Sequence, residues 1–280
     1  TVSFLSDITG NQQVWRVSTA PDAQLHWPEQ LTFFADKVWD IHGTPAVDHL
    51  VATSDVGGNE RQQLYLITVD RPAAQGDSNS VHSVQRLTTD DEAIHRFGAF
   101  SANGQEIVYT ANARNGTDFD PYWMDLVTGA WRRLAETTGN RLIVAWSEDT
   151  GQLLLLDAVA SEQLELYVLD VASGRERHLT GTTPPARYFP ITWADHGLYV
   201  ITDRERDRGA ICRMDVETAE LTELVTADDL LSDLDGLSGE IDFDTVAGSS
   251  AHGAFILNVE GYSRLHLLDF AGGACRPVGD

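Results

Sequence analysis

The sequence predicts an all-β fold, a β-propeller of four-stranded antiparallel blades, and three observations support this. A short apolar pair recurs along the chain at intervals of 44 to 58 residues, the spacing of a repeat protein. Short apolar runs alternate with turn signals such as Asn103-Gly104 and Gly272-Gly273. Convincing amphipathic helices are missing, and the best candidate, 227–236, is short.

The recurring pair marks one strand of each repeated unit, and most copies include an aromatic residue. The copies are Val14-Trp15, Leu64-Tyr65, Tyr122-Trp123, Leu166-Tyr167, Ile211-Cys212 and Leu265-His266. Four strands in about 45 residues is the size of a propeller blade, which buries its apolar faces by stacking on its neighbours. A two-sheet sandwich is the alternative, but it needs no repeat. We expect about six blades in a single domain, 1–280. Their approximate bounds are 1–35, 36–91, 92–139, 140–184, 185–230 and 231–280.

The unit 140–184 shows the strands most clearly. Leu153–Asp157 is a continuous apolar run, typical of a strand buried on both faces, and Leu164–Asp170 is the next strand. A turn at 171–174 leads to a polar edge strand at 175–180. A second marker, Leu-Thr or Leu alone, recurs at the end of this strand and at equivalent places in four other units.

The two ends of the chain depart from the full blade pattern. Val2–Ser6 already reads as the second strand of a blade, so the first unit lacks its innermost strand, and 274–280 reads as an outer edge strand. An open ring would expose unpaired edges. We therefore expect the propeller to be incomplete at its ends and the intact protein to supply more strands.

The net charge of −24, with Lys37 as the one lysine, excludes some partners. Such a surface repels phosphate backbones and anionic membranes, so we expect neither a nucleic-acid partner nor a membrane. No apolar run reaches the length of a membrane span and no signal peptide is visible, so we expect a cytoplasmic location.

Catalytic and metal-binding motifs are also missing from the sequence. Cys212 and Cys275 have no C-x-x-C spacing, and neither G-x-S-x-G nor H-E-x-x-H occurs. A calcium loop at 233–236 fails because Glu240 comes too early. We expect no catalytic residue, no metal and no cofactor in this chain.

The innermost strands of four successive units each open with a basic residue. These are Lys37, Arg96, Arg141 and Arg187, four of only 19 basic residues. In a propeller, equivalent positions of successive blades lie around one mouth of the central channel, where cations would attract a carboxylate or an acidic peptide. The alternative is that they cap strand ends or pair with nearby acids. Those acids include Asp36, Asp40 and Glu92.

The loop between the second and third strands of a blade shares a rim with the start of the first strand. In the second unit this loop is Gly57–Arg61, whose glycines allow a tight turn. We expect Asn59, Glu60 and Arg61 to lie near the basic residues. Glu60 could receive a cationic group, and a local salt bridge with Arg61 is the alternative reading.

The segment Ser54–Tyr65, with its Gly-Gly-Asn-Glu run before an apolar-aromatic strand, resembles the blade motif of acylaminoacyl-peptidase-like members of the prolyl oligopeptidase family. Val2–Asp7 and Gln30–Thr32 resemble the opening of such a propeller. The run Tyr188-Phe189-Pro190, with the later Trp193, is shared with TolB-like and tricorn-like propellers.

In the prolyl oligopeptidase family the propeller caps a covalently linked α/β-hydrolase domain that carries the serine-peptidase triad. The resemblance implies a propeller that admits short peptides, excludes folded proteins and holds a substrate terminus. A stand-alone TolB-like propeller that binds protein partners is the second hypothesis. A propeller enzyme such as a lactonase or glycosidase is the third, and it would need a carboxylate cluster or a metal in the channel.

Overall fold

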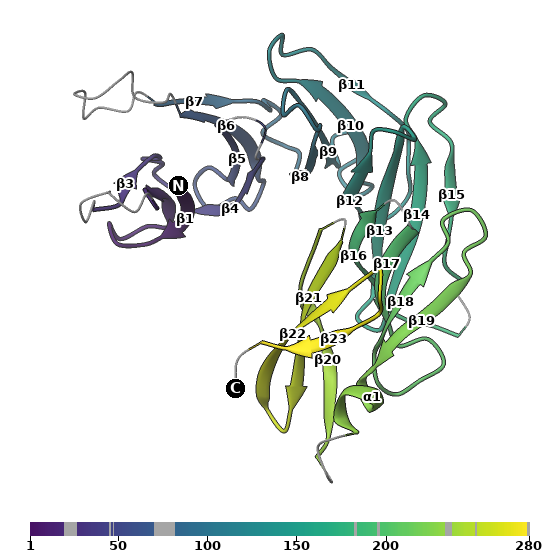
Figure 1. Ribbon diagram of the computed structural model, residues 1–280. Coiled ribbons are helices and arrows are strands. Elements are labelled where there is room, and N and C mark those ends of the chain that lie inside the picture. The colour runs from purple at the N-terminus through teal and green to yellow at the C-terminus, as the bar shows by residue number, and fades with distance from the viewer. Residues whose placement is uncertain are drawn as a thin grey trace. The chain divides into compact units, whose positions relative to one another are not determined.

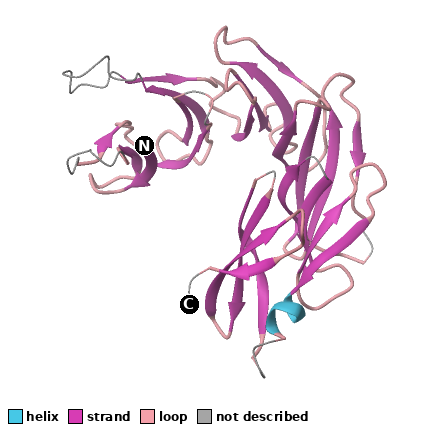
Figure 2. Ribbon diagram, viewed as in Figure 1, coloured by secondary structure: helices cyan, strands magenta, loops and turns pink. Residues whose placement is uncertain are grey.

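Antiparallel strands make up nearly all of the regular structure in the computed structural model (Figures 1 and 2). The structure describes residues 1–19, 27–44, 46, 48–69, 82–181, 184–194, 197–232, 237–249 and 251–278, with the backbone alone at 243–247. The one helix in these ranges is α1 (Ala227–Leu231), capped by Thr226 and Asp229. It starts where the sequence predicts, and 233–236, which includes the rejected calcium loop, lies outside the described residues.

The strands form six antiparallel sheets in chain order, which confirms the predicted blades. The first sheet has three strands, and it begins with the predicted Val2–Ser6. It holds β1 (Val2–Ser6), β2 (Gln13–Val17) and β3 (Glu29–Gln30). The second holds β4 (Val38–Gly43), β5 (His49–Ser54), β6 (Gln63–Val69) and β7 (His82–Arg86). The third holds β8 (His95–Phe100), β9 (Glu106–Ala111), β10 (Asp120–Asp125) and β11 (Trp131–Arg133).

The remaining sheets each have four strands. The fourth holds β12 (Arg141–Ser147), β13 (Gln152–Ala160), β14 (Gln163–Asp170) and β15 (Glu176–His178). The fifth holds β16 (Tyr188–Ala194), β17 (Gly197–Thr202), β18 (Ala210–Met214) and β19 (Leu221–Thr226). The sixth holds β20 (Gly239–Gly248), β21 (His252–Val259), β22 (Tyr262–Asp269) and β23 (Cys275–Pro277). Every sheet lies within one of the ranges expected for a blade.

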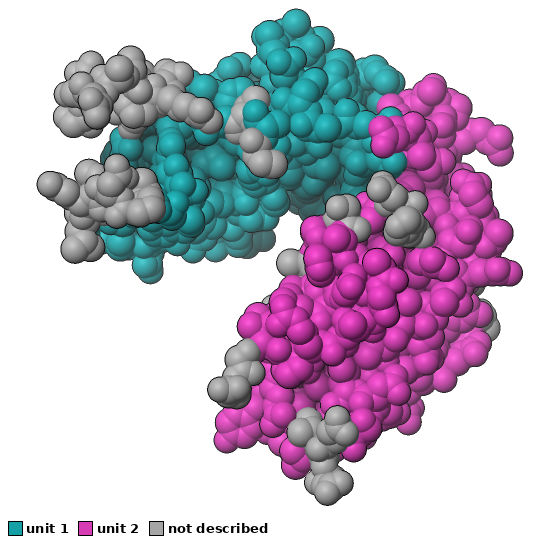
Figure 3. Space-filling view, in the orientation of Figure 1, with its two compact units in different colours: residues 1–148 teal, residues 149–280 magenta. Residues whose placement is uncertain are grey.

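The chain divides into two compact units, Thr1–Glu148 and Asp149–Asp280 (Figure 3). The boundary falls between β12 and β13, the first two strands of the fourth sheet. The single domain expected over 1–280 stays a prediction, and each unit is described below by itself.

The Leu-Thr marker closes the outer edge of a blade. In the first sheet, Leu31 N–H donates to the Val14 carbonyl (2.8 Å), and the Thr32 hydroxyl accepts from Val14 N–H (2.9 Å). Leu87 and Thr88 make the same pair of bonds to Leu64 at 2.8 and 3.0 Å. The leucine backbone and the threonine hydroxyl together satisfy backbone groups of the neighbouring strand that the short outer strand leaves unpaired, which explains why the Leu-Thr pair recurs.

Apolar side chains fill both faces of the central strands. Leu153 and Leu155 are fully buried, as predicted, and so is Leu154 between them. In the unit 149–280, Tyr199 stacks on Phe270 with ring centroids 3.7 Å apart. Leu164, at the start of β14, is only half-buried, because it lines a cavity.

Neighbouring innermost strands approach closely at two glycines. A Cβ added at Gly98 in β8 would lie 2.6 Å from Cβ of Ile143 in β12, too close for two carbons. At Gly248 in β20, an added Cβ would lie 2.6 Å from Cβ of Thr192. Both glycines are therefore required for space. In the described part of the chain, none of the helical structure is long and apolar enough to cross a membrane.

Candidate functional site

The four predicted basic residues all lie at the start of an innermost strand. Lys37 directly precedes β4, Arg96 is the second residue of β8, Arg141 is the first residue of β12, and Arg187 directly precedes β16. The first three belong to the unit 1–148, and Arg187 belongs to the unit 149–280.

Lys37 contacts an aromatic ring that is hydrogen-bonded to a buried carboxylate. Its ammonium lies 3.2 Å from the ring centroid of Trp39, a cation–π contact. The indole N–H of Trp39 donates to Asp55 (2.9 Å), which is only 4% exposed. Burial raises the pKa of Asp55, but hydrogen bonds from Trp39 and the Glu60 N–H, with the charge of Lys37, lower it below its ordinary value overall. Asp55 therefore stays ionised and links Lys37 to the following loop.

The loop Gly57–Arg61 is held by acceptors on both sides. Gly57 N–H donates to the carboxylate of Asp36 (2.7 Å), and Glu60 N–H donates to Asp55 (2.8 Å). Glu60 has a positive φ of 59°, an unusual conformation for a residue other than glycine. The structure thus brings Lys37 and this loop together through Asp36 and Asp55.

Asn59 and Glu60, in the middle of this loop, are exposed. The sequence left open a local salt bridge between Arg61 and Glu60. In the structure, Arg61 forms its ion pair with Glu92 instead. Asn59 accepts a hydrogen bond from Arg61 N–H (3.0 Å). Asn59 and Glu60 therefore remain accessible to a partner on this rim.

Arg96 is held in place by the segment that precedes β12. Its guanidinium carbon lies 3.9 Å from the ring centroid of Phe119, and Nη1 donates to Asn140 (2.5 Å). Burial lowers the pKa of Arg96, which still remains charged near neutral pH. The adjacent Arg141 is 5% exposed, so it belongs to the interior of the unit and not to an open surface.

Asp120 fixes the neighbouring rim loop. This carboxylate is fully buried and accepts from Arg114 Nε (2.7 Å) and Nη2 (3.1 Å) and from Thr137 N–H (2.9 Å). Arg133 Nη1 lies 3.4 Å from it. The network ties the loop carrying Phe119 to the segment 136–140 and so positions the ring beneath Arg96.

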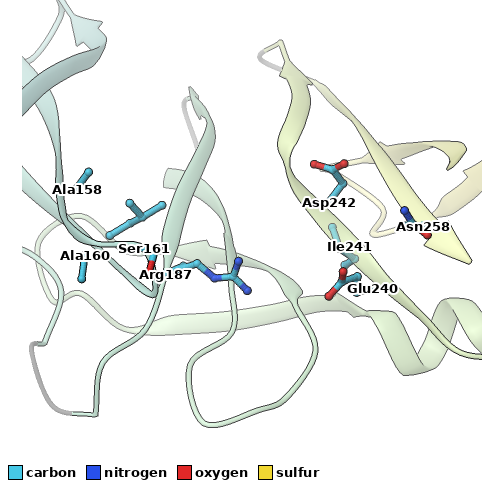
Figure 4. Close-up of a pocket in the computed structure, with 9 residues that line it drawn as sticks. Ala158, Ala160, Ser161, Arg187, Glu240, Ile241, Asp242 and Asn258 are labelled. Atoms are coloured by element: carbon cyan, nitrogen blue, oxygen red, sulfur yellow. The ribbon is translucent and has the colours of Figure 1, made fainter. Parts of the chain in front are cut away.

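A polar cavity of about 610 Å³ lies within the unit 149–280, and Arg187 lines it (Figure 4). Figure 4 shows the guanidinium directed toward the start of β20, which carries Glu240, Ile241 and Asp242. Asn258 in β21 pairs with Glu240 across the sheet. Ala160, the last residue of β13, and Ser161, on the turn that follows it, form the opposite wall.

The cavity has an excess of negative charge. Asp203 neutralises Arg187, since its carboxylate accepts from Arg187 N–H (2.7 Å) and from Nε (2.8 Å). Glu240 is exposed and makes no ion pair with any residue in the described ranges, and Asp242 is half-buried beside it. Glu240, beside an arginine that Asp203 neutralises, favours a cationic group over an anionic one.

Sequence reasoning missed several residues of these sites, namely Trp39, Asp55, Phe119 and Asp242. A Trp or Phe near a basic residue gives no signal of its own in one sequence, because the contact depends on the fold. Asp203 begins a mixed-charge run, 203–208, in the loop after β17, but the sequence does not indicate that it pairs with Arg187.

Metal and thiol chemistry find little support in the described ranges. No group of three His, Cys, Asp or Glu side chains there could hold a metal ion. Cys212 and Cys275 are free thiols, and burial raises the pKa of Cys212 to about 11. This thiol is therefore protonated near neutral pH and unreactive.

Comparison with known proteins shows the fold but not a sequence family. No family model matches the chain, and no curated protein matches its sequence. TolB from Acinetobacter baumannii is similar in structure, with 16% identity and a TM-score of 0.56, over 96% of this chain and 60% of that one. The fold is thus that of TolB-like propellers.

Two enzymes share the fold at higher TM-scores. A puromycin-hydrolyzing peptidase from Mycobacterium tuberculosis matches at 14% identity and a TM-score of 0.64, over 98% of this chain and 43% of its own. Oligogalacturonate lyase from Vibrio parahaemolyticus matches at 10% identity and a TM-score of 0.67, over 99% of this chain and 73% of its own. At such identities the likeness is one of fold. More than half of the peptidase lies outside the match.

Proposed function

We propose that this chain is the substrate-gating and substrate-positioning propeller of a prolyl oligopeptidase-type serine peptidase. The cavity beside Arg187 carries the proposal, because it combines a paired arginine, two carboxylates and an amide on the rim where innermost strands begin. In this proposal the hydrolase domain belongs to the parent protein, and short peptides are the substrates. The chain is similar in fold to part of a peptidase, and that peptidase's own chain extends well beyond the match. This is consistent with the proposal.

The cavity would hold the amino end of a peptide. A peptide ammonium is a compact cation with three hydrogen-bond donors, and Glu240, Asp242 and Asn258 offer acceptors around one space of suitable size. Arg96, in the unit 1–148, would attract acidic peptides by its charge, as the sequence suggests.

Binding of short peptides to the chain tests the cavity directly. Triglycine is expected to bind, and N-acetylation is expected to weaken its binding about tenfold, since the ammonium loses charged hydrogen bonds. Amidation of its carboxyl end should change the affinity less than N-acetylation does. Glu240→Gln should also weaken binding about tenfold. Calorimetric titration measures each affinity.

The matched control is Glu217→Gln, which removes another exposed carboxylate of the same unit, one paired with Arg177. Its affinity for triglycine should equal that of the unchanged chain. Equal binding of acetylated and free triglycine would contradict an ammonium site. Tight binding of a folded protein partner instead of peptides would favour the TolB-like alternative.

The parent protein tests the gating role. Its gene is expected to encode a hydrolase domain with a G-x-S-x-G motif. In that enzyme, Arg96→Ala should raise KM for short acidic peptides more than for neutral ones and leave kcat unchanged, because it removes attraction and not chemistry. Arg187→Ala should have the smaller effect, since Asp203 neutralises Arg187. Equal changes in KM for both peptide classes would make these arginines structural.

A further inference from the structure

A second cavity lies within the unit 1–148, between the segment that follows β7 and the third sheet. Its volume is about 210 Å³. Among its lining residues, His95 alone belongs to an innermost strand. The others come from the segment after β7, from β9, β10 and β11, and from the loop after β9. The cavity is therefore separate from the basic residues at the strand starts.

Three aromatic side chains form its walls. The rings of Tyr109 and Tyr122 stack with centroids 5.2 Å apart and an interplanar angle of 13°. Trp131 lies 5.9 Å from Tyr122 and is tilted by 57°. Both tyrosines are almost completely buried, whereas Trp131 is 62% exposed. The cavity thus has a buried aromatic interior and an exposed aromatic side chain at its mouth.

The size of the cavity suits one ring. A cavity of about 150 Å³ lined by apolar side chains is enough to bind benzene in another protein. The volume here is moderately larger. A six-membered ring with a short substituent would fit, and its faces could stack on or pack edge-on against the tyrosines.

One carboxylate borders the cavity, and the arginines nearest to it, Arg86 and Arg133, are paired with other acids. Asp90 lines it, is exposed, and makes no ion pair with any residue that the structure describes; its Oδ1 accepts from Glu92 N–H (3.0 Å). The nearby Arg86 is held by Asp91 and by the carbonyl of Thr88 (2.6 Å). Burial lowers the pKa of His95 to about 4, so its ring is neutral near pH 7 and repels no cation.

We propose that this cavity binds an aromatic ring that carries an ammonium group, with the ring against Tyr109 and Tyr122 and the ammonium beside Asp90. Aromatic faces attract cations, and the carboxylate at the mouth also attracts the ammonium group. The site is independent of the peptide-binding role proposed for the other unit.

Benzylamine is the probe, and its affinity is measured by ligand-observed NMR titration of the whole chain. Cyclohexylmethylamine keeps the charge without the aromatic ring, and benzoate keeps the ring but reverses the charge. Benzylamine is expected to bind at least about fivefold more tightly than either. Trp131→Ala and Asp90→Asn should each weaken it about threefold.

Both substitutions alter exposed side chains, so the fold should survive, and circular dichroism checks this. Trp27→Ala and Asp7→Asn are matched controls, because they remove an exposed tryptophan and an exposed aspartate elsewhere in the same unit. Their affinity for benzylamine should be unchanged. The proposal is overturned if benzylamine does not bind. It is also overturned if benzoate or cyclohexylmethylamine binds equally well, or if the controls weaken binding as much as the cavity variants do.

Discussion

Replacing Asp120 by alanine is expected to lower the free energy of unfolding of the unit 1–148 by about 3 kcal/mol. The carboxylate is fully buried and accepts hydrogen bonds from two side chains and one backbone group. Without it, Thr137 N–H is left buried and unpaired, and Arg114 and Arg133 lose their shared anion. The arginines are partly exposed and can regain water, so we expect the low end of the range for a broken buried pair.

Urea unfolding followed by tryptophan fluorescence measures this change. Glu136→Ala is the control, since it removes an exposed carboxylate from the same Arg133. An exposed pair contributes about 0–1 kcal/mol, so this variant should unfold close to the unchanged chain. If both variants lower the free energy of unfolding by the same amount, the buried network does not hold the loop of Phe119 beneath Arg96.

Replacing Leu155 by alanine is expected to lower the free energy of unfolding of the unit 149–280 by about 3 kcal/mol. Leu155 is fully buried in β13, which lies between β12 and β14 in the fourth sheet. Apolar side chains cover both faces of this strand. Truncation removes apolar contacts and leaves a void that a close-packed blade can refill only in part.

The control for this experiment lies in the same strand. Val159 is 51% exposed, so Val159→Ala should change the free energy of unfolding by less than about 0.5 kcal/mol. The urea midpoint should fall for Leu155→Ala with no change in the slope of the transition, because the surface exposed on unfolding stays nearly the same. A similar midpoint for both variants would contradict burial of β13 on both faces.

Much of the fold was predictable because the repeat is local in the sequence. The apolar-aromatic pair marks the third strand of five blades and the equivalent β2 of the first, and the Leu-Thr marker closes the outer edges of the first, second and fourth sheets through the same pair of bonds. The basic residues Lys37, Arg96, Arg141 and Arg187 could be placed at strand starts for the same reason. Alternation along a strand reports which face is buried, so strands and turns follow from pattern alone.

The candidate site was only partly predictable, since its chemistry depends on pairs that the pattern does not specify. The sequence indicates that Arg187 is basic and lies on a rim, but not that Asp203 neutralises it. Arg61 could have paired with Glu60 beside it, and the turn instead directs it to Glu92. Such choices follow from loop geometry and from the positions of neighbouring strands, not from spacing.

The amino-acid sequence alone established the all-β class, the repeated four-stranded unit, the strongly negative charge and the absence of a known catalytic motif. These follow from composition and from period-two patterns, which are properties of short segments. The close approach at Gly98, the buried Asp120 network and the aromatic cavity emerged from the folded chain. Each joins residues of different strands or sheets, and such contacts depend on strand twist, on bulges such as the one between Phe97 and Ala99, and on side-chain packing.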